Sequence, residues 1–336
     1  MHKIQQVRYY LSRLKDVDFQ NMRRIAKKVA QKTRRPGLAV LLDIILCSLR
    51  YQSGYMDYYE FEFYLLNAKE RATYLTSGIN NSIVTRYCDK SAWESLEDKA
   101  AFNRMFSRFL KREWLDLREC GEEAFRAFAA RHPVLIVKPV CGCGGRGVER
   151  IDTEKEPDLS ALFHRLRRNG QVLVEEVLIQ HPEMDKLYAG AVNTLRMITF
   201  LQENGEPVVL KRVLKVGNGG VTDNFSSGGM YTFCAPDGTV LAPAIDEEGH
   251  VFEKHPASGV PFSGFRVPLM QEADALVCEA ARLVPKLRYV GWDVAVLPDG
   301  CALIEGNWFC GIFQMKPSLS GEKTGDLPLY RQYMDL

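Results

Sequence analysis

The sequence predicts an α+β fold in which a helical region, residues 1–95, precedes a mixed domain, residues 96–336. In the first region, apolar residues recur every three or four positions, as they do in amphipathic helices. In the second, short runs rich in β-branched residues are separated by tight-turn sequences. Because few helical segments lie between these strands, hairpins and an antiparallel sheet are favoured over a doubly wound parallel sheet.

The helical region starts with a strongly basic segment. Residues 1–37 contain eleven Lys and Arg against Asp16 and Asp18, a net charge of +9 in a chain whose total is +2. Pro36-Gly37 separates the first two helices. Their apolar stripes are Ile4, Val7, Leu11 and Leu14, then Leu41, Ile44, Ile45 and Leu49. We interpret the charge first as a solvated helix face; an anionic glycan, a membrane surface or an acidic partner are the alternatives.

Composition limits the classes of function and location. The small total charge and the lack of a nucleic-acid motif argue against a nucleic-acid partner. Nine scattered cysteines, an odd number without a Cys-x-x-Cys pair, indicate reduced thiols in a cytosol. The most apolar stretch, residues 38–49, is too short to span a bilayer, and residues 1–6 show no signal peptide. We therefore expect a cytoplasmic protein without a transmembrane segment, with peripheral membrane contact through the basic N-terminus left open.

The elements of the chain are predicted in order from periodicity and turn residues. The aromatic run 55–64 is expected to pack in a core, and a helix at 98–113 precedes the first strand. Strands are expected at 134–140, 148–152 and 172–177, with a helix at 159–168. The rest of the domain is expected to begin with a hairpin at 194–201 and 208–216 and strands at 230–234 and 239–243. A helix at 269–287, which starts after Pro268, and a strand pair at 289–297 and 301–306 follow.

A glycine-rich loop follows the strand that ends at Lys138. Its glycines are Gly142, Gly144, Gly145 and Gly147. A dinucleotide-binding loop would open a helix, but an alternating strand pattern follows this one. We therefore predict a hairpin whose bare backbone folds over a nucleotide's phosphates, with the Lys138 ammonium beside them. A surface hairpin with a solvated lysine is the alternative.

Three oxygen-bearing residues lie in the last strand pair: Asp293, Glu305 and Asn307. The neighbouring residues are mostly apolar, so at least one face of this hairpin is buried, and two acids and an amide on the other face need a partner such as a cation. Hard oxygen ligands held by rigid strands suit Mg²⁺. An acidic solvent face is the competing interpretation.

The turn of this hairpin decides whether the ligands share a face. A two-residue turn would direct Asp293 away from Glu305. A three-residue loop, Pro298-Asp299-Gly300, would pair Leu297 with Cys301 and place Asp293 opposite Glu305. We predict the longer loop, because proline's fixed φ suits a turn position and its missing N–H would weaken a ladder.

The ordered set of motifs over residues 98–310 resembles the ATP-grasp superfamily. It comprises Lys99, Lys138 before the glycine-rich hairpin, the segment 172–178, and the Asp and Glu-x-Asn hairpin. Within this superfamily the chain is similar to the sugar-transfer-associated branch, which is often linked with cell-surface polysaccharide. The similarity lies in the segments 193–199, 291–293 and 304–307 and, in the helical front, in Asp57-Tyr58-Tyr59 and Glu70-Arg71. The resemblance implies two α+β subdomains that grip ATP. The first, about residues 96–178, contains the glycine-rich hairpin and the hinge, and the second, residues 179–336, contains the metal site.

The resemblance also implies roles for individual residues. The implied nucleotide-binding residues are Lys99, Lys138, Gly142, Gly144, Gly145, Gly147, Glu175, Glu176, Leu178 and Lys211, with either Glu183 or Asp185 on the ribose. Asp293, Glu305 and Asn307 match the metal ligands. Arg196, Lys211 or Arg212, and Asn224 match positions near the γ-phosphate and the acceptor carboxylate.

The expected cofactors are ATP and two Mg²⁺ ions, with Mn²⁺ able to replace them. The expected reaction is that of a carboxylate–amine or carboxylate–thiol ligase: ATP phosphorylates a carboxylate, a nucleophile attacks the acyl phosphate, and ADP and phosphate leave. The resemblance implies a small-molecule or glycan-precursor carboxylate and an amine as substrates. A phosphotransferase acting on a hydroxyl and a non-catalytic nucleotide-binding scaffold are the alternatives.

Overall fold

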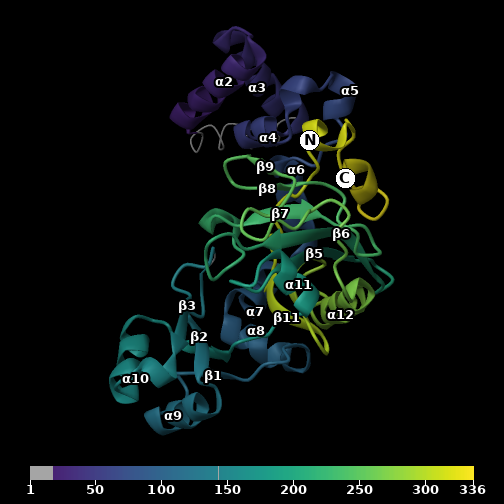
Figure 1. The fold of residues 1–336 in the computed structure, drawn as a ribbon. Coiled ribbons are helices and arrows are strands. Elements are labelled where there is room, and N and C mark those ends of the chain that lie inside the picture. The colour runs from purple at the N-terminus through teal and green to yellow at the C-terminus, as the bar shows by residue number, and fades with distance from the viewer. Residues whose placement is uncertain (1–17, 143) are drawn as a thin grey trace. The chain divides into compact units, whose positions relative to one another are not determined.

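The computed structural model describes residues 18–142 and 144–336, and it divides the chain into two compact units (Figure 1). One unit combines residues 18–82 with Gln314–Leu336, and the other is Ile83–Phe313. This division differs from the predicted boundary at residues 95/96, and it places the C-terminal segment with the helical unit. The predicted stripe of Ile4, Val7, Leu11 and Leu14 lies outside the described residues.

The first unit consists of helices. They are α2 (Phe19–Thr33), α3 (Gly37–Tyr51), α4 (Tyr55–Glu60), η1 (Phe63–Leu65), α5 (Ala68–Arg71), the start of α6 (Ser77–Tyr87), α13 (Pro317–Ser320) and α14 (Leu327–Tyr330). The aromatic run forms core as predicted, since Tyr58, Phe61 and Phe63 are buried. Gln314 attaches the C-terminal segment, because its side-chain amide bonds the backbone N–H and C=O of Leu75 at 2.9 and 2.7 Å.

Two of the front motifs have structural roles inside this unit. The Arg71 guanidinium donates two hydrogen bonds to Asp43 at 2.7 and 2.9 Å, and the Tyr58 hydroxyl donates a third at 2.7 Å. Asp57 accepts hydrogen bonds from the backbone N–H groups of Gly54 and Ser77. These charge-assisted contacts join α3, α4, α5 and the start of α6.

The second unit begins with short helical segments: η2 (Lys90–Ala92), α7 (Glu94–Glu97), α8 (Lys99–Met105) and η3 (Ser107–Phe109). Asp98 caps α8 by accepting from two backbone N–H groups at its start. The helix predicted at 98–113 is thus shorter, because α8 ends at Met105 and the chain tightens into η3.

A four-stranded antiparallel sheet follows, in the order β1 (Trp114–Asp116), β4 (Leu173–Glu176), β2 (Val134–Lys138) and β3 (Glu149–Asp152). Its core is closed by α9 (Glu122–Arg131) and α10 (Leu159–Arg168), through residues such as Phe125, Phe128 and Leu166. η4 (Thr153–Lys155) follows β3. The β2–β3 ladder confirms the predicted antiparallel hairpin around the glycine-rich loop.

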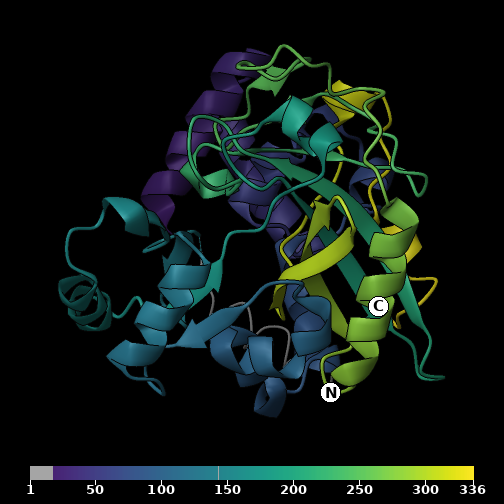
Figure 2. The same cartoon turned by 60° about the horizontal axis from the view of Figure 1, so that its bottom comes forward.

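A seven-stranded antiparallel sheet forms the rest of the unit. Its order is β11 (Gly300–Asn307), β10 (Tyr289–Leu297), β5 (Thr194–Leu201), β6 (Pro207–Val216), β7 (Met230–Phe233), β8 (Ala244–Ile245) and β9 (Val251–Phe252). The remaining elements are α11 (Pro182–Leu187), η5 (Phe225–Ser227) and α12 (Met270–Leu283). Helix α12 packs along β5, β6 and β11 (Figures 1 and 2). The strand predicted at 239–243 is replaced by isolated bridges before β8.

The register of β10 and β11 corrects the predicted turn. Leu297 pairs with Gly300, so the loop has two residues, Pro298 and Asp299, and the three-residue prediction is wrong. Asp293 nevertheless pairs with Glu305, because a β-bulge next to it inserts one extra residue, Ile304, into β11. The bulge restores the pairing that the turn alone would have shifted.

A second bulge lies in the β5–β6 hairpin. Thr199 pairs with Val209 whereas Ile198 pairs with Lys211, so one residue of β6 has no partner. Beyond the bulge, Arg196 pairs with Val213. Because side chains alternate along a strand, this shift determines which basic residues of β6 share a face with Arg196.

Candidate active site

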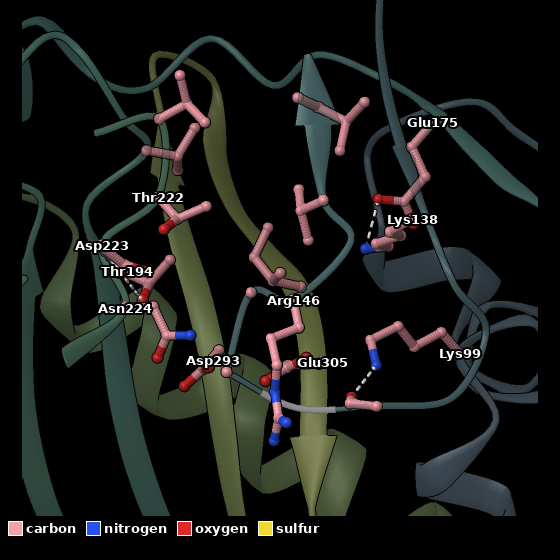
Figure 3. A pocket seen from close by; sticks show the side chains of 18 of the residues that line it. Lys99, Lys138, Arg146, Glu175, Thr194, Thr222, Asp223, Asn224, Asp293 and Glu305 are labelled. Carbon is pink, nitrogen blue, oxygen red and sulfur yellow. Dashed lines mark hydrogen bonds and ion pairs between the residues drawn. The ribbon is translucent and has the colours of Figure 1, made fainter. Parts of the chain in front are cut away.

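A cavity of about 300 Å³ lies within the second unit and is lined by both of its sheets (Figure 3). It brings together most of the residues predicted for the site: Lys99, Lys138, Gly142, Gly144, Gly145, Glu175, Glu176, Leu178, Arg196, Asn224, Asp293, Glu305 and Asn307. The four-stranded sheet supplies Lys138 and Glu175 from the ends of β2 and β4. The seven-stranded sheet supplies Arg196, Asp293 and Glu305 from β5, β10 and β11.

Asp293 is buried and held by two cations. The Arg196 guanidinium donates to both of its carboxylate oxygens, with Nη2 at 3.0 Å from Oδ2, and the Lys215 Nζ lies 3.3 Å from Oδ2. Arg196 also donates from Nη1 to the Cys310 carbonyl at 3.1 Å. Burial alone would raise the pKa of Asp293, but Arg196 and Lys215 outweigh it and hold that pKa well below its ordinary value. The carboxylate is therefore ionised at neutral pH.

Lys215 links Asp293 to a second acid, Asp223. Its ammonium lies 3.5 Å from the Asp223 carboxylate, and Asp223 accepts hydrogen bonds from the backbone N–H and the hydroxyl of Thr194. Burial would lower the pKa of Lys215, but the two acids outweigh it and raise that pKa. The result is a charged cluster across β5, β6 and β10 whose two cations, Arg196 and Lys215, line the cavity.

Glu175 forms the other charged cluster. Its buried carboxylate accepts from Lys138 at 2.7 Å, Arg112 at 3.0 Å and Asn103 at 2.9 Å. Burial would raise the pKa of Glu175, but Arg112 and Lys138 outweigh it and lower the pKa to about 2. Glu175 therefore orients Lys138 beneath the glycine-rich hairpin. Glu176, next along β4, instead turns to the backbone N–H of Glu113 at 3.0 Å.

The glycine-rich hairpin needs its glycines for conformation. Gly142, Gly144, Gly145 and Gly147 all have positive φ, between 69° and 124°. The Lys99 ammonium donates to the Gly142 carbonyl at 2.7 Å. A side chain at position 145 would also press on Asn224, whose Nδ2 lies 3.2 Å from where its Cβ would be. The backbone at this loop therefore approaches the cavity more closely than other residues would allow.

Arg146 lies between two of these glycines and lines the cavity, a position that the sequence interpretation did not select. It is exposed, and within the described part of the chain it makes no ion pair, unlike Arg112, Arg196 and Lys215. Figure 3 shows its side chain directed toward the part of the cavity that holds Asp293 and Glu305. Its guanidinium is therefore available to an anionic ligand.

Four predicted residues do not line the cavity: Gly147, Asp185, Lys211 and Arg212. Asp185 accepts from Gln180 at 2.8 Å, and its alternative, Glu183, pairs with Lys186 instead. The Lys211 ammonium lies over the Phe233 ring, 5.1 Å from its centroid. The assignment of the ribose contact to Glu183 or Asp185 stays a prediction. On β6, the basic side chain that lines the cavity is that of Lys215 and not of Lys211 or Arg212.

Arg212 faces α12, because the bulge in the β5–β6 hairpin pairs it with Met197 and turns it away from Arg196. It makes two hydrogen bonds to Asp274, at 2.8 and 2.7 Å. We expect Arg212→Ala to lower stability by about 1 kcal/mol, since a half-buried ion pair is lost, and to leave turnover within about twofold of the parent. Urea unfolding and nucleotide turnover measure the two effects. Arg196→Ala is the comparison, and equal losses of turnover in both variants would contradict the assignment.

The oxygen donors of β10 and β11 fit a magnesium ion. Asp293 and Glu305 are opposite one another in the ladder, and Asn307 follows on β11, its amide 3.4 Å from Glu305 Oε1. Carboxylate and amide oxygens are the ligands that Mg²⁺ prefers. Each carboxylate oxygen can accept more than one partner, so the bonds from Arg196 do not exhaust Asp293.

Sequence reasoning missed Arg112, Arg146, Thr194, Lys215 and Asp223. Two signals were present: Asp223 precedes the selected Asn224, and Arg146 lies inside the selected glycine motif. No signal in the sequence indicated Lys215 or Arg112. The position of Lys215 depends on a β-bulge, and Arg112 reaches Glu175 across 63 residues of sequence.

A family model described as sugar-transfer associated ATP-grasp matches residues 79–324. Glutathione synthetase of Pseudomonas aeruginosa is 26% identical over 190 residues, which are 56% of this chain and 51% of that protein. The chain thus spans about half the length of this curated relative. The structure of the ATP-grasp ligase PsnB complexed with minimal precursor, Mg and ADP is similar with a TM-score of 0.39 and 17% identity, over 82% of this chain and 70% of that one. D-alanyl-alanine synthetase A of Vibrio cholerae gives a TM-score of 0.39 and 13% identity, over 66% and 58%.

Proposed function

Because the chain belongs to the sugar-transfer associated ATP-grasp family, we propose that it is an ATP-dependent ligase that activates a carboxylate as an acyl phosphate. An amine or a thiol then attacks the acyl carbon, and ADP and phosphate are released. We further propose that the carboxylate or the amine belongs to a sugar, an amino acid or a surface-polymer precursor. The family description supports a substrate linked to sugar transfer, and the chain is similar to a glutathione synthetase.

One observation supports the proposal most: a single cavity holds cationic donors from both sheets together with Asp293, Glu305 and Asn307. Transfer of a phosphoryl group to a carboxylate brings two anions together, so fixed cations must offset their repulsion. Lys215 is buried and Arg196 is half-buried, and acids already orient both cations. They can hold an acceptor carboxylate against the γ-phosphate without reorganising.

The other side of the cavity suits the nucleotide. Lys99 and Arg146 lie where the glycine-rich hairpin would cover phosphates, and Lys138 is held beneath that hairpin by Glu175. Leu178 and Ile304 offer apolar surface for a purine base next to the end of β4. Magnesium bound by Asp293, Glu305 and Asn307 would supply positive charge to the phosphate oxygens.

The proposal is tested by assaying ADP release with ATP, Mg²⁺ and a panel of sugar and amino-acid carboxylates, with hydroxylamine present. Hydroxylamine traps an acyl phosphate as a hydroxamate, so a ligase yields ADP and hydroxamate in equal amounts. A phosphorylated hydroxyl with no hydroxamate would overturn the proposal in favour of a phosphotransferase. Absence of ATP binding by calorimetry would overturn it altogether.

Arg146 gives a specific prediction for this mechanism. Arg146→Ala should lower kcat/KM for ATP by about tenfold to a hundredfold, since one charge-assisted contact to a phosphate is lost, and should leave the melting temperature unchanged because the residue is exposed. Steady-state kinetics with varied ATP measures the effect. Arg150→Ala is the control, because Arg150 is an exposed arginine of β3 outside the cavity. Equal kinetics for the two variants would remove Arg146 from the site.

A further inference from the structure

Helix α3 presents an apolar face to solvent. Leu38, Leu42, Ile45, Leu46 and Leu49 are exposed by 70, 53, 40, 62 and 57%. At 100° per residue they occupy one side of the helix, and the buried residues Val40, Ile44 and Cys47 occupy the opposite side. A surface helix normally has polar residues on its outward face. In α3 both faces are apolar, and among the described residues only one of them packs in a core.

The α2–α3 segment that carries this apolar face is strongly basic. Between Phe19 and Tyr51 the chain carries eight basic residues and one acid, Asp43, a net charge of +7. Arg23, Arg24, Lys27, Lys28, Lys32, Arg34, Arg35 and Arg50 are exposed. The acid is already held by Arg71.

Some of the basic residues of α2 lie beside the apolar face, whereas Lys32 pairs with Glu62 instead. Arg23, Lys27 and Arg34 line an open depression between α2 and α3 together with Leu38 and Leu41. In Figure 1, α2 and α3 form a hairpin of two adjacent helices. Basic residues of α2 therefore lie directly beside the N-terminal end of the apolar face of α3.

From this arrangement we infer that the α2–α3 pair is a docking surface for an anionic lipid bilayer. Leucines inserted at the level of the acyl boundary, with cations at the level of the headgroups, are the pattern of an interfacial helix. Polybasic residues add attraction to anionic lipids but not to zwitterionic ones. A protein partner would need to combine an apolar patch with acidic residues to match this cationic surface.

The docking is parallel to the membrane and does not span it. Helix α3 has 15 residues, fewer than a bilayer crossing requires. Among the described residues, no helix has the length and apolarity to cross a membrane. The inference does not depend on the proposed ligase activity, because none of these residues lines the cavity of the second unit.

The experiment is flotation of the full-length chain with vesicles of phosphatidylcholine alone and of phosphatidylcholine with phosphatidylglycerol. The parent should float with the mixed vesicles only, and added salt should weaken its binding. The double variant Leu42→Glu/Leu46→Glu should bind at least about a hundredfold more weakly, and Arg23→Gln/Lys27→Gln about tenfold more weakly. Leu241→Glu, at a leucine of the other unit that is 56% exposed, is the matched control and should bind like the parent.

Circular dichroism melting of each variant shows that its fold is kept, as expected for exposed positions. Failure of the parent to float with mixed vesicles would overturn the inference. Equal binding by the Leu42→Glu/Leu46→Glu variant would do so as well. Light scattering provides a third test. If the parent forms a dimer that this variant does not form, and the parent does not bind vesicles, the face is an interface between two copies and the inference is overturned.

Discussion

Glu305→Gln is expected to reduce ADP formation by at least about a hundredfold while leaving the fold intact. Glutamine keeps the size of the side chain but removes the charge that faces Asp293 across the β10–β11 ladder. Under the proposed function this charge holds magnesium against the phosphates, and the loss of one such electrostatic contact typically costs two or three orders of magnitude in rate. Glu305 is half-buried and makes no ion pair among the described residues, so stability should change little.

The measurement is kcat at saturating ATP over a titration of Mg²⁺, with thermal melting of the same samples. The activity that remains should require more Mg²⁺ than the parent needs. Glu203→Gln is the control, since its side chain is 91% exposed and outside the cavity. Unchanged activity and magnesium dependence in Glu305→Gln would exclude Glu305 as a metal ligand. Such a result would also remove support for the proposed catalytic role of the charged clusters around it.

Glu175→Ala is expected to destabilise the protein by about 3–5 kcal/mol. The carboxylate is 4% exposed and is the shared partner of Arg112 and Lys138. Its removal leaves two buried cations close together without a counter-charge. Guanidinium unfolding followed by tryptophan fluorescence measures the change. Glu113→Ala breaks a pair with Arg131 that is more than half exposed, and it should have a much smaller effect. Similar losses for both would show that the Glu175 cluster contributes no more than a surface pair.

The same carboxylate predicts a pH dependence of stability. Its pKa in the fold is about 2, compared with 4.5 for an unperturbed glutamate. Because the folded state holds the proton less tightly, the stabilisation is complete above pH 4.5 and is lost as the pH falls from there toward 2. In Glu175→Gln this loss is absent, so unfolding free energies measured between pH 4.5 and 2 should fall less steeply than those of the parent. Parallel curves for the two proteins would contradict this prediction.

Local pattern was enough to predict most elements and many, but not all, of the residues that line the cavity. The helix at 159–168 and the strand at 289–297 have the predicted bounds, because each has a strong apolar period between clear turn residues. The family resemblance rests on residue types in a fixed order, so it identified Lys99, Lys138, Asp293 and Glu305, all of which line one cavity.

Register and burial were decided only by the tertiary structure. The extra residues in β6 and β11 have no compositional signal in the sequence. The bulge in β6 places Lys215 instead of Arg212 beside Asp293. The bulge in β11 compensates for a turn that is one residue shorter than predicted. Likewise, the stripe of Leu41, Ile44, Ile45 and Leu49 indicates a helix, but only Ile44 of the four is buried. Sequence period determines which residues share a face. Whether that face meets a core, a cavity or solvent depends on the segments that pack against it, and these are distant in the chain.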